Sequence, residues 1–219
     1  MQPGGIAGPI SGLILAGGRS SRMEGRNKAL LTLAGQPLIG HVIDRLAPQV
    51  EALALSVEQP AKAFAVFGVP HLADPTPGHA GPLGGLLAGL RHFQAQQGWV
   101  LLLPCDAPFL PLDLATKLRE SAAVSKVPAA LVYHEGELQP TFSIWHHSLL
   151  PPLEQAVEGA GMAGLKQFLH TIEFARVDGS EWAPTAGPPP FFNINDPAAL
   201  DQASRWVLSE RRARSSCSA

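Results

Sequence analysis

A glycine-rich loop with three cationic side chains is the most chemically suggestive stretch of this 219-residue sequence. Gly17 and Gly18 directly follow a short apolar run, and Arg19, Arg22 and Lys28 come next. Adjacent glycines permit a tight turn that exposes successive backbone N–H groups, which bind phosphate oxygens. The alternative is an ordinary strand–helix turn with basic surface residues. The spacing fits neither the dinucleotide fingerprint Gly-x-Gly-x-x-Gly nor a P-loop, whose lysine precedes Ser or Thr.

Asp106 is the candidate metal ligand. It follows Pro104, which closes the apolar run 99–103. Because the carboxyl ends of parallel strands meet at one edge of a sheet, its carboxylate should face the glycine loop. Mg²⁺ prefers oxygen ligands and often takes one or two carboxylates plus substrate phosphates. The alternative role is capping a helix near Pro111. Asp74 lies at the same predicted edge, where it could instead form a turn.

Apolar patterns predict the elements that position these groups in the first half of the chain. Continuous apolar runs predict strands at 10–16, 52–57 and 99–103, with a weaker one at 69–73. Apolar residues at positions i, i+3, i+4 and i+7 predict helices between Pro37 and Pro48 and over 83–90. This alternation predicts an α/β fold: a doubly wound, mostly parallel sheet with helices on both faces.

The apolar pattern of the second half of the chain predicts a small antiparallel section of the sheet. Segments 129–133 and 138–145, separated by a short polar stretch, form a predicted hairpin. Helices are predicted at 149–157, 165–170 and 197–208, with a strand at 171–177. We therefore expect one domain over 1–208, followed by a flexible tail over 209–219.

Composition narrows the classes of protein to consider. Hydrophobic residues make up 46% and charged residues 16% of the chain, which excludes disorder for most of it. A net charge of −2 offers no global field for nucleic acid or an anionic membrane, and no apolar run could span a bilayer. Two cysteines cannot build a disulfide framework, and no signal peptide is evident, so we expect a cytoplasmic protein. Cys105, beside the candidate metal ligand, is interpreted as a buried thiol rather than a nucleophile.

The glycine loop resembles the signature of the nucleotidyltransferases: Leu15-Ala16-Gly17-Gly18, then Arg22-Met23 and Lys28. Within that superfamily the chain resembles the molybdenum cofactor guanylyltransferases, which join GMP to molybdopterin. Five further segments support this resemblance and occur in the family's order: 35–38, 81–85, 104–109, 140–142 and 193–197.

The resemblance implies a nucleotide-diphospho-sugar transferase-like fold, GTP and molybdopterin as substrates, and Mg²⁺. It implies a nucleotide-binding half over 10–110 and an acceptor-binding half over 111–208. Catalysis is expected from Arg22, Lys28 and Asp106, with Asp106 holding the metal. The nucleotide is expected at Leu15, Ala16, Gly17, Gly18, Lys28, Ser56, Asp74, Gly81 and Asp106. The acceptor is expected at Pro140, Thr141, Asn193 and Asn195.

Three positions depart from the family pattern. Ser56 stands where the family often has Asn, Glu24 where Gly usually follows Arg-Met, and Asn27 where Asp usually precedes the lysine. Two alternatives therefore stay open: a cytidylyltransferase acting on molybdopterin, and a nucleotide-binding regulatory protein without turnover. Adjacent Gly17 and Gly18, where cytidylyl relatives commonly show Ala-Gly, favour guanine. Contact with proteins that make or receive the molybdenum cofactor is also left open.

Overall fold

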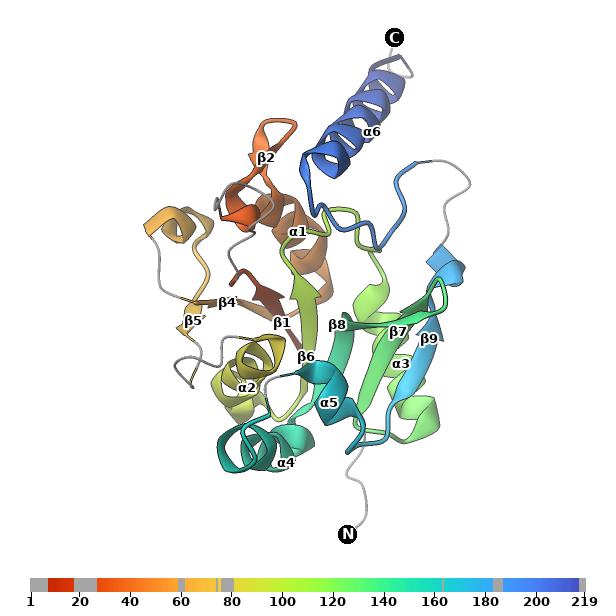
Figure 1. The fold of residues 1–219 in the computed structure, drawn as a ribbon. Coiled ribbons are helices and arrows are strands. Elements are labelled where there is room, and N and C mark those ends of the chain that lie inside the picture. Colours follow the sequence, from red (N-terminus) through yellow and green to blue (C-terminus); the bar gives the residue numbers. More distant parts are fainter. Residues whose placement is uncertain are drawn as a thin grey trace.

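The computed structural model describes residues 8–17, 27–58, 62–73, 75, 81–162, 164–182 and 187–216. Its centre is a seven-stranded sheet in the order β5-β4-β1-β6-β8-β7-β9 (Figure 1). The strands are β1 (Ile10–Leu15), β4 (Ala52–Val57), β5 (His71–Ala73), β6 (Trp99–Pro104), β7 (Ala129–His134), β8 (Glu137–His146) and β9 (Ala175–Asp178).

Strand direction divides the sheet into two sections. β5, β4, β1 and β6 are parallel neighbours, so their carboxyl ends share one edge. β8 runs antiparallel to both β6 and β7, and β9 is parallel to β7. The predicted mostly parallel sheet and the predicted hairpin in the second half are therefore both confirmed.

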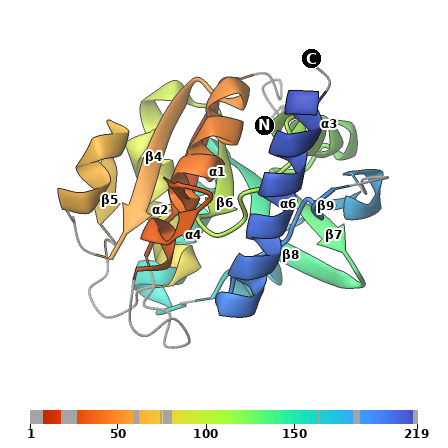
Figure 2. The ribbon, with the colours of Figure 1, turned by 90° about the horizontal axis from the view of Figure 1, so that it is seen from above.

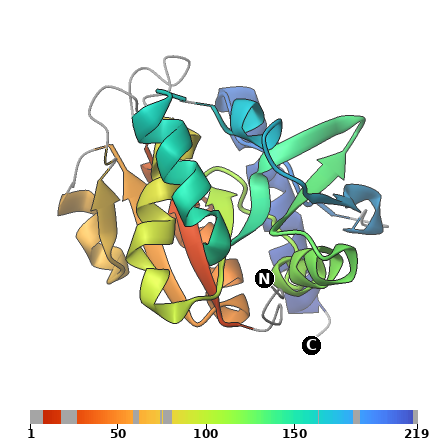
Figure 3. The same cartoon turned by 90° about the horizontal axis from the view of Figure 1, so that it is seen from below.

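Helices cover both faces of the sheet, because parallel neighbours need crossover connections. α1 (Leu38–Leu46) and α3 (Leu114–Ser125) pack on one face. The other face carries α2 (Pro82–His92), α4 (Leu150–Glu154) and α5 (Leu165–Leu169). Seen from below, the yellow-green α2 and teal α4 lie side by side, across the sheet from α1 and α3 (Figure 3).

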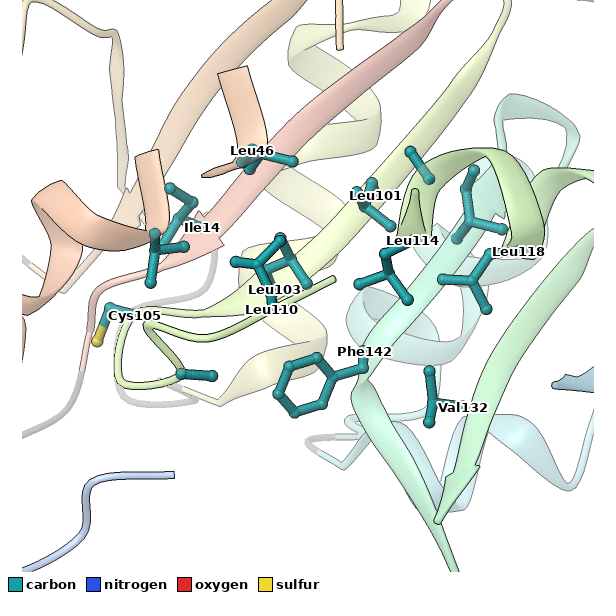
Figure 4. Packing of buried hydrophobic residues seen from close by; sticks show 14 of the residues in the cluster. Ile14, Leu46, Leu101, Leu103, Cys105, Leu110, Leu114, Leu118, Val132 and Phe142 are labelled. Atoms are coloured by element: carbon teal, nitrogen blue, oxygen red, sulfur yellow. The ribbon is translucent and has the colours of Figure 1, made fainter. Parts of the chain in front are cut away.

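The strand β6 explains why the central strands appear as unbroken apolar runs. Leu101 and Leu103 pack into the α1/α3 layer, whereas Val100 and Leu102 pack into the α2/α4/α5 layer. Figure 4 shows the first of these layers, where Leu101 and Leu103 lie among side chains of neighbouring elements, including Leu114 of α3. A strand buried on both faces has no polar side to expose.

The C-terminal helix α6 (Pro197–Ser216) packs outside these two layers. It contacts the small hairpin of β2 (Thr32–Leu33) and β3 (Gln36–Pro37) and lies alongside α1 when viewed from above (Figure 2). Leu33, Leu38, Ile194 and Ala203 form the buried centre of this contact. The chain segment that precedes α6 is thereby held near the start of α1.

Several boundaries differ from the sequence prediction. The last helix continues to Ser216 rather than ending at 208, because no glycine or proline interrupts 209–216, so most of the predicted tail is helical. β9 begins at Ala175 rather than at 171, and β5 begins at His71 rather than at 69. The predicted helix over 149–157 is a composite of a 3-10 turn (His147–Leu149), α4 and a π-helical segment (Gln155–Gly159).

Short helical turns complete the described chain: η2 (Lys28–Leu30), η3 (Ala47–Gln49), η4 (Lys62–Phe67), η5 (Gln94–Gln96) and η8 (Gly179–Trp182). The β2–β3 hairpin was not predicted, and its turn places Ala34 and Gly35 at positive φ. Within the described ranges, none of the helices combines the length and the apolar character needed to cross a bilayer.

Candidate active site

Lys28 is presented by the short turn η2. The side-chain oxygen of Asn27 accepts a hydrogen bond from the backbone N–H of Ala29 at 3.1 Å, which caps the turn. Asn caps helical turns about as well as Asp does. The replacement of the family's usual Asp by Asn27 therefore preserves the cap that positions the lysine.

Asp106 lies just past the carboxyl end of β6, at the edge that the sequence predicts. Its backbone carbonyl accepts a hydrogen bond from the N–H of Ile194 at 2.9 Å. This bond ties the loop after β6 to the segment that leads into α6. Residues separated by nearly ninety positions in the sequence are thus held side by side.

Three polar side chains from three distant segments meet at this point. The Lys28 ammonium forms an ion pair with a carboxylate oxygen of Asp106, and it also donates to the Asn195 side-chain oxygen at 2.5 Å. The Lys28 and Asp106 side chains are only 14% and 13% exposed. The sequence predicted the approach of Lys28 to Asp106, and the structure confirms it.

The second carboxylate oxygen of Asp106 is buried and has no hydrogen-bond partner among the described residues. A buried acceptor without a partner costs free energy, so such an atom commonly serves a ligand. No group of three His, Cys, Asp or Glu side chains suited to a metal occurs in the described part of the chain. One carboxylate with a free oxygen suits Mg²⁺, which takes its remaining ligands from water and phosphates.

Cys105 precedes Asp106 and is buried. Burial, followed by the charge of Asp106, raises the pKa of its thiol to about 12. Since the thiolate is the nucleophilic form, this cysteine is chemically inert at neutral pH. The interpretation of Cys105 as a structural thiol agrees with this environment.

A second cluster lies where β1 and β4 end. The N–H of Ala16, a buried residue, donates to the Ser56 carbonyl at 2.8 Å, which fixes the start of the glycine loop against β4. A Cβ added at Gly85 in α2 would lie 2.6 Å from the Ser56 hydroxyl oxygen and 2.7 Å from Leu15. The glycine at this position therefore allows α2 to approach both strand ends.

The remaining predicted nucleotide residues are only partly described. Gly17 is exposed, and a Cβ there would lie 3.3 Å from the backbone nitrogen of Glu58. Gly81 is the N-cap of α2 and is half-buried. Gly18, Arg22 and Asp74 lie outside the described residues, as do Arg19 and Glu24.

The predicted acceptor residues lie on two elements. Asn193 is half-buried, and its side-chain oxygen is buried with no partner among the described residues. Asn195, two residues on, belongs to the Lys28 cluster. Pro140 and Thr141 lie in β8 instead, in a bulge where Leu131 pairs with residue 143 and the next residue of β7 pairs with residue 139. Proline cannot donate to the ladder, which accounts for the bulge.

Sequence reasoning did not foresee two features of this site. It placed Asn195 on the acceptor, whereas the structure shows that its oxygen also accepts from Lys28. It did not single out Gly85 as the point where α2 touches Ser56, although the pair Gly84-Gly85 inside a helical pattern is a signal of close packing.

Comparison with known proteins agrees with this geometry. Residues 12–177 match the family model of the MobA-like NTP transferase domain. The chain is 37% identical over 203 residues to a molybdenum cofactor guanylyltransferase of Rhodopseudomonas palustris, covering 91% of this chain and 95% of the relative. A protein of the same name from Vibrio cholerae is 39% identical over 193 residues, covering 88% and 90% of the two chains.

Solved structures share the fold. The crystal structure of molybdopterin-guanine dinucleotide biosynthesis protein A from Archaeoglobus fulgidus superposes with a TM-score of 0.75 at 22% identity, covering 91% of this chain and 99% of that one. A CMP:2-keto-3-deoxy-manno-octonic acid synthetase complexed with CTP superposes with a TM-score of 0.68 at 17% identity, covering 92% and 99%. Together, the family model and the sequence relatives show that this chain belongs to the MobA-like NTP transferase family.

Proposed function

We propose that this chain transfers GMP from GTP to molybdopterin, forming molybdopterin guanine dinucleotide and releasing pyrophosphate. The observation that carries the proposal is the meeting of Lys28, Asp106 and Asn195 at the carboxyl edge of the sheet. Sequence relatives that span nearly the whole chain and are named molybdenum cofactor guanylyltransferase support the choice of substrates.

The reaction needs alignment and charge neutralisation rather than a general base. An oxygen of the acceptor's terminal phosphate forms a bond to the α-phosphorus of GTP, and the bond from that phosphorus to the bridging β-phosphate oxygen breaks. The attacking phosphate is already anionic, since the second pKa of a phosphate monoester is about 6. Pyrophosphate leaves with the electron pair of the broken bond.

Lys28 is proposed to bind the triphosphate. Its ammonium lies at the rim of the sheet, held between the Asp106 carboxylate and the Asn195 amide oxygen. A lysine acts there as a point charge that compensates negative charge developing on the phosphoryl oxygens. Arg22 and the N–H groups of Gly17 and Gly18 are proposed to add further positive potential from the glycine loop.

Asp106 is proposed to hold a divalent metal ion, Mg²⁺, through its buried oxygen that lacks a partner. The bound ion would supply positive charge that compensates the charge of the phosphate oxygens. The chain's own contribution is to keep the carboxylate oriented, which the Ile194 hydrogen bond to the Asp106 backbone does.

The nucleotide and the acceptor are proposed to occupy opposite halves of the sheet, formed by 10–110 and 111–208. Guanine would lie against the backbone of Leu15 and Ala16, Ser56 and the start of α2 at Gly81, with Asp74 near the nucleotide. The acceptor would be held by Asn193, Asn195 and the bulge at Pro140 and Thr141. The buried side-chain oxygen of Asn193 can accept a hydrogen bond from a pterin N–H.

Pyrophosphate release from GTP, with molybdopterin and Mg²⁺ present, tests the proposal. We expect Asp106→Ala to abolish transfer while the fold is retained. Lys117→Gln, at a half-buried lysine on α3 that pairs with Glu181, should transfer at the normal rate. Thermal stabilisation by GTP but not CTP is expected, because selective binding raises apparent stability. Stabilisation by CTP alone would identify a cytidylyltransferase. Nucleotide binding without pyrophosphate release would identify a regulatory protein.

A further inference from the structure

The helix α6 packs against the rest of the molecule through one apolar stripe. The stripe recurs at the three- and four-residue spacing of a single helix face, and its members are Ala199, Leu200, Ala203, Trp206 and Val207. None of the residues proposed to bind a substrate or the metal ion lies on this helix. Trp206 is the largest side chain of the stripe, and its contacts lead back to the reaction site.

The Trp206 ring touches two phenylalanine rings that come from distant segments. The ring centres of Trp206 and Phe192 lie 5.0 Å apart, with the ring planes at 84°. Those of Trp206 and Phe109 lie 5.9 Å apart, with the planes at 82°. Both pairs have the edge-to-face geometry that aromatic rings prefer. The indole therefore joins the loop after β6 to the segment before α6.

Each of these phenylalanines lies three residues from a polar side chain of the Lys28 cluster. Phe109 follows Asp106, and Phe192 precedes Asn195. Between them, the N–H of Ile194 donates to the Asp106 carbonyl at 2.9 Å. In Figure 1 the blue segment before α6 runs beside the green loop after β6. The backbone hydrogen bond and the indole thus hold the same two segments together.

Side-chain contacts alternate along the segment before α6. Phe191 packs into the α1/α3 layer, whereas Phe192 and Ile194 pack into the α6 contact. Successive side chains of an extended chain point to opposite sides, so holding Phe192 and Ile194 sets the direction of Asn195. Asn195 is itself exposed, and its own packing does not fix it. Its approach to Lys28 therefore depends on the anchors on either side of it in the α6 contact.

The proposed reaction depends on the spacing between these two segments. Asp106 belongs to one segment and Asn195 to the other, and the Lys28 ammonium lies between them. Misplacing a catalytic group by about 1 Å can lower a rate about 100-fold. A loose contact between the segments would let the cluster open by local motion.

We infer that Trp206 is a positioning residue for the transfer reaction. Through its two phenylalanine neighbours it keeps the loop after β6 and the segment before α6 at a fixed spacing around Lys28. The inference rests on the proposed function, since the reaction that is aligned is GMP transfer. Because the nucleotide is proposed to bind at the ends of β1 and β4 and at the start of α2, a change at Trp206 should affect turnover more than nucleotide binding.

The kinetics of GMP transfer in variants of the α6 contact test this role. Trp206→Leu keeps an apolar side chain but removes the ring, and we expect kcat to fall about tenfold while the KM for GTP changes less than about threefold. Trp206→Phe restores a ring and should bring kcat to within about threefold of the parent value. Phe192→Leu removes the same contact from the other side and should reproduce the loss, which also tests the role if Trp206→Leu does not fold.

The matched control is Val207→Ala, which removes apolar volume from the same stripe one residue further on. Its kcat should stay within about twofold of the parent value. Thermal unfolding followed by circular dichroism verifies that each variant is folded at the assay temperature.

Acetylation of Lys28 by acetic anhydride, measured by mass spectrometry without substrates, gives a readout that does not need turnover. The Lys28 side chain is 14% exposed and paired with Asp106, whereas the reference Lys117 is 32% exposed. In Trp206→Leu and Phe192→Leu, the rate of Lys28 relative to Lys117 should rise at least about threefold, because the cluster opens more often. In Val207→Ala the ratio should stay at the parent value.

Four results would overturn the inference: a normal kcat in both ring variants, a rise in the KM for GTP with kcat unchanged, an equal loss of kcat in Val207→Ala, or an unchanged Lys28 ratio in both ring variants. If the parent chain transfers GMP and any of these is found, the positioning role fails alone. If the parent chain releases no pyrophosphate but the Lys28 ratio rises as expected, the proposed function fails alone and Trp206 still positions the cluster.

Discussion

The Lys28–Asp106 ion pair makes a quantitative prediction for a double-mutant cycle. Breaking a fully buried ion pair by removing one partner costs about 3–5 kcal/mol. Because these side chains are 14% and 13% exposed, water screens part of that cost, and we expect Lys28→Met to lower the free energy of unfolding by about 2–3 kcal/mol. The reason is that Asp106 would keep a negative charge while neither of its oxygens has a hydrogen-bond partner among the described residues.

Asp106→Asn should cost less, about 1 kcal/mol, because Lys28 keeps the Asn195 oxygen at 2.5 Å and gains a neutral amide oxygen. The double variant has no buried charge left at this point. The decrease in the free energy of unfolding of the double variant should therefore be about 1–2 kcal/mol smaller than the sum of the decreases in the two single variants. The double variant should still fail to transfer GMP, because it lacks both the Lys28 ammonium proposed to bind the triphosphate and the Asp106 carboxylate proposed to hold the metal ion.

Guanidinium unfolding followed by tryptophan fluorescence measures these differences, provided that the dependence on denaturant concentration stays constant across the variants. Lys117→Met is the matched control. Its ammonium pairs with Glu181 at 3.1 Å, and the Lys117 side chain is 32% exposed, so the free energy of unfolding should change by less than about 1 kcal/mol. Strictly additive losses at Lys28 and Asp106 would show that the two groups do not stabilise each other. Recovery of transfer in the double variant would refute their catalytic assignment.

Three further predictions address other parts of the molecule. The first concerns Cys105, in a chain whose other cysteine is replaced by serine. Cys105 should react with iodoacetamide at pH 8 at least about 100-fold more slowly in the folded than in the unfolded chain, because burial raises the pKa of its thiol to about 12. Equal rates would contradict the interpretation of Cys105 as a buried thiol. Burial, and then the neighbouring His147, lower the pKa of His146 from 6.5 to about 4. Between these pH values the unfolded chain binds a proton that the folded chain does not, so the free energy of unfolding should fall as the pH drops from 6.5 to 4. For a half-buried ring we expect about 1–2 kcal/mol from this shift, and His146→Gln should flatten the pH dependence of the urea midpoint. Gly85→Ala should lower the free energy of unfolding by about 1–2 kcal/mol despite the gain in helix propensity, because the new Cβ would lie 2.6 Å from the Ser56 hydroxyl oxygen. The control is Gly164→Ala, where a Cβ would meet nothing within 4 Å. Thermal unfolding should show this control to be neutral or stabilising.

Local patterns predicted most of the architecture, because strands buried on both faces and helices with one apolar stripe leave periodic signals. The runs at 52–57 and 99–103 became β4 and β6 with almost no change of boundary. The β2–β3 hairpin was missed because two-residue strands carry no periodicity. The helix predicted over 149–157 was found, but its 3-10 start and π-helical end were not predicted, because a change of winding within a helix has no signal in apolar spacing.

The sequence by itself determined the class of the fold and the residue types of the site. A glycine loop after one apolar run and an aspartate after another must meet at one edge of a parallel sheet, because all carboxyl ends lie there. The signature loop and the order of the five further motifs resembled the same family that the relatives then showed.

Only the tertiary structure decided how Lys28 is shared between Asp106 and Asn195, since no local pattern relates side chains so far apart in the chain. It also brings Tyr133, Lys166 and Arg176 together around one pocket, although the hairpin tip, the short helix and the edge strand that carry them are separate in sequence. Periodicity reports the face of an element that is buried. The partners across that face depend on packing, and packing exists only once the chain has folded.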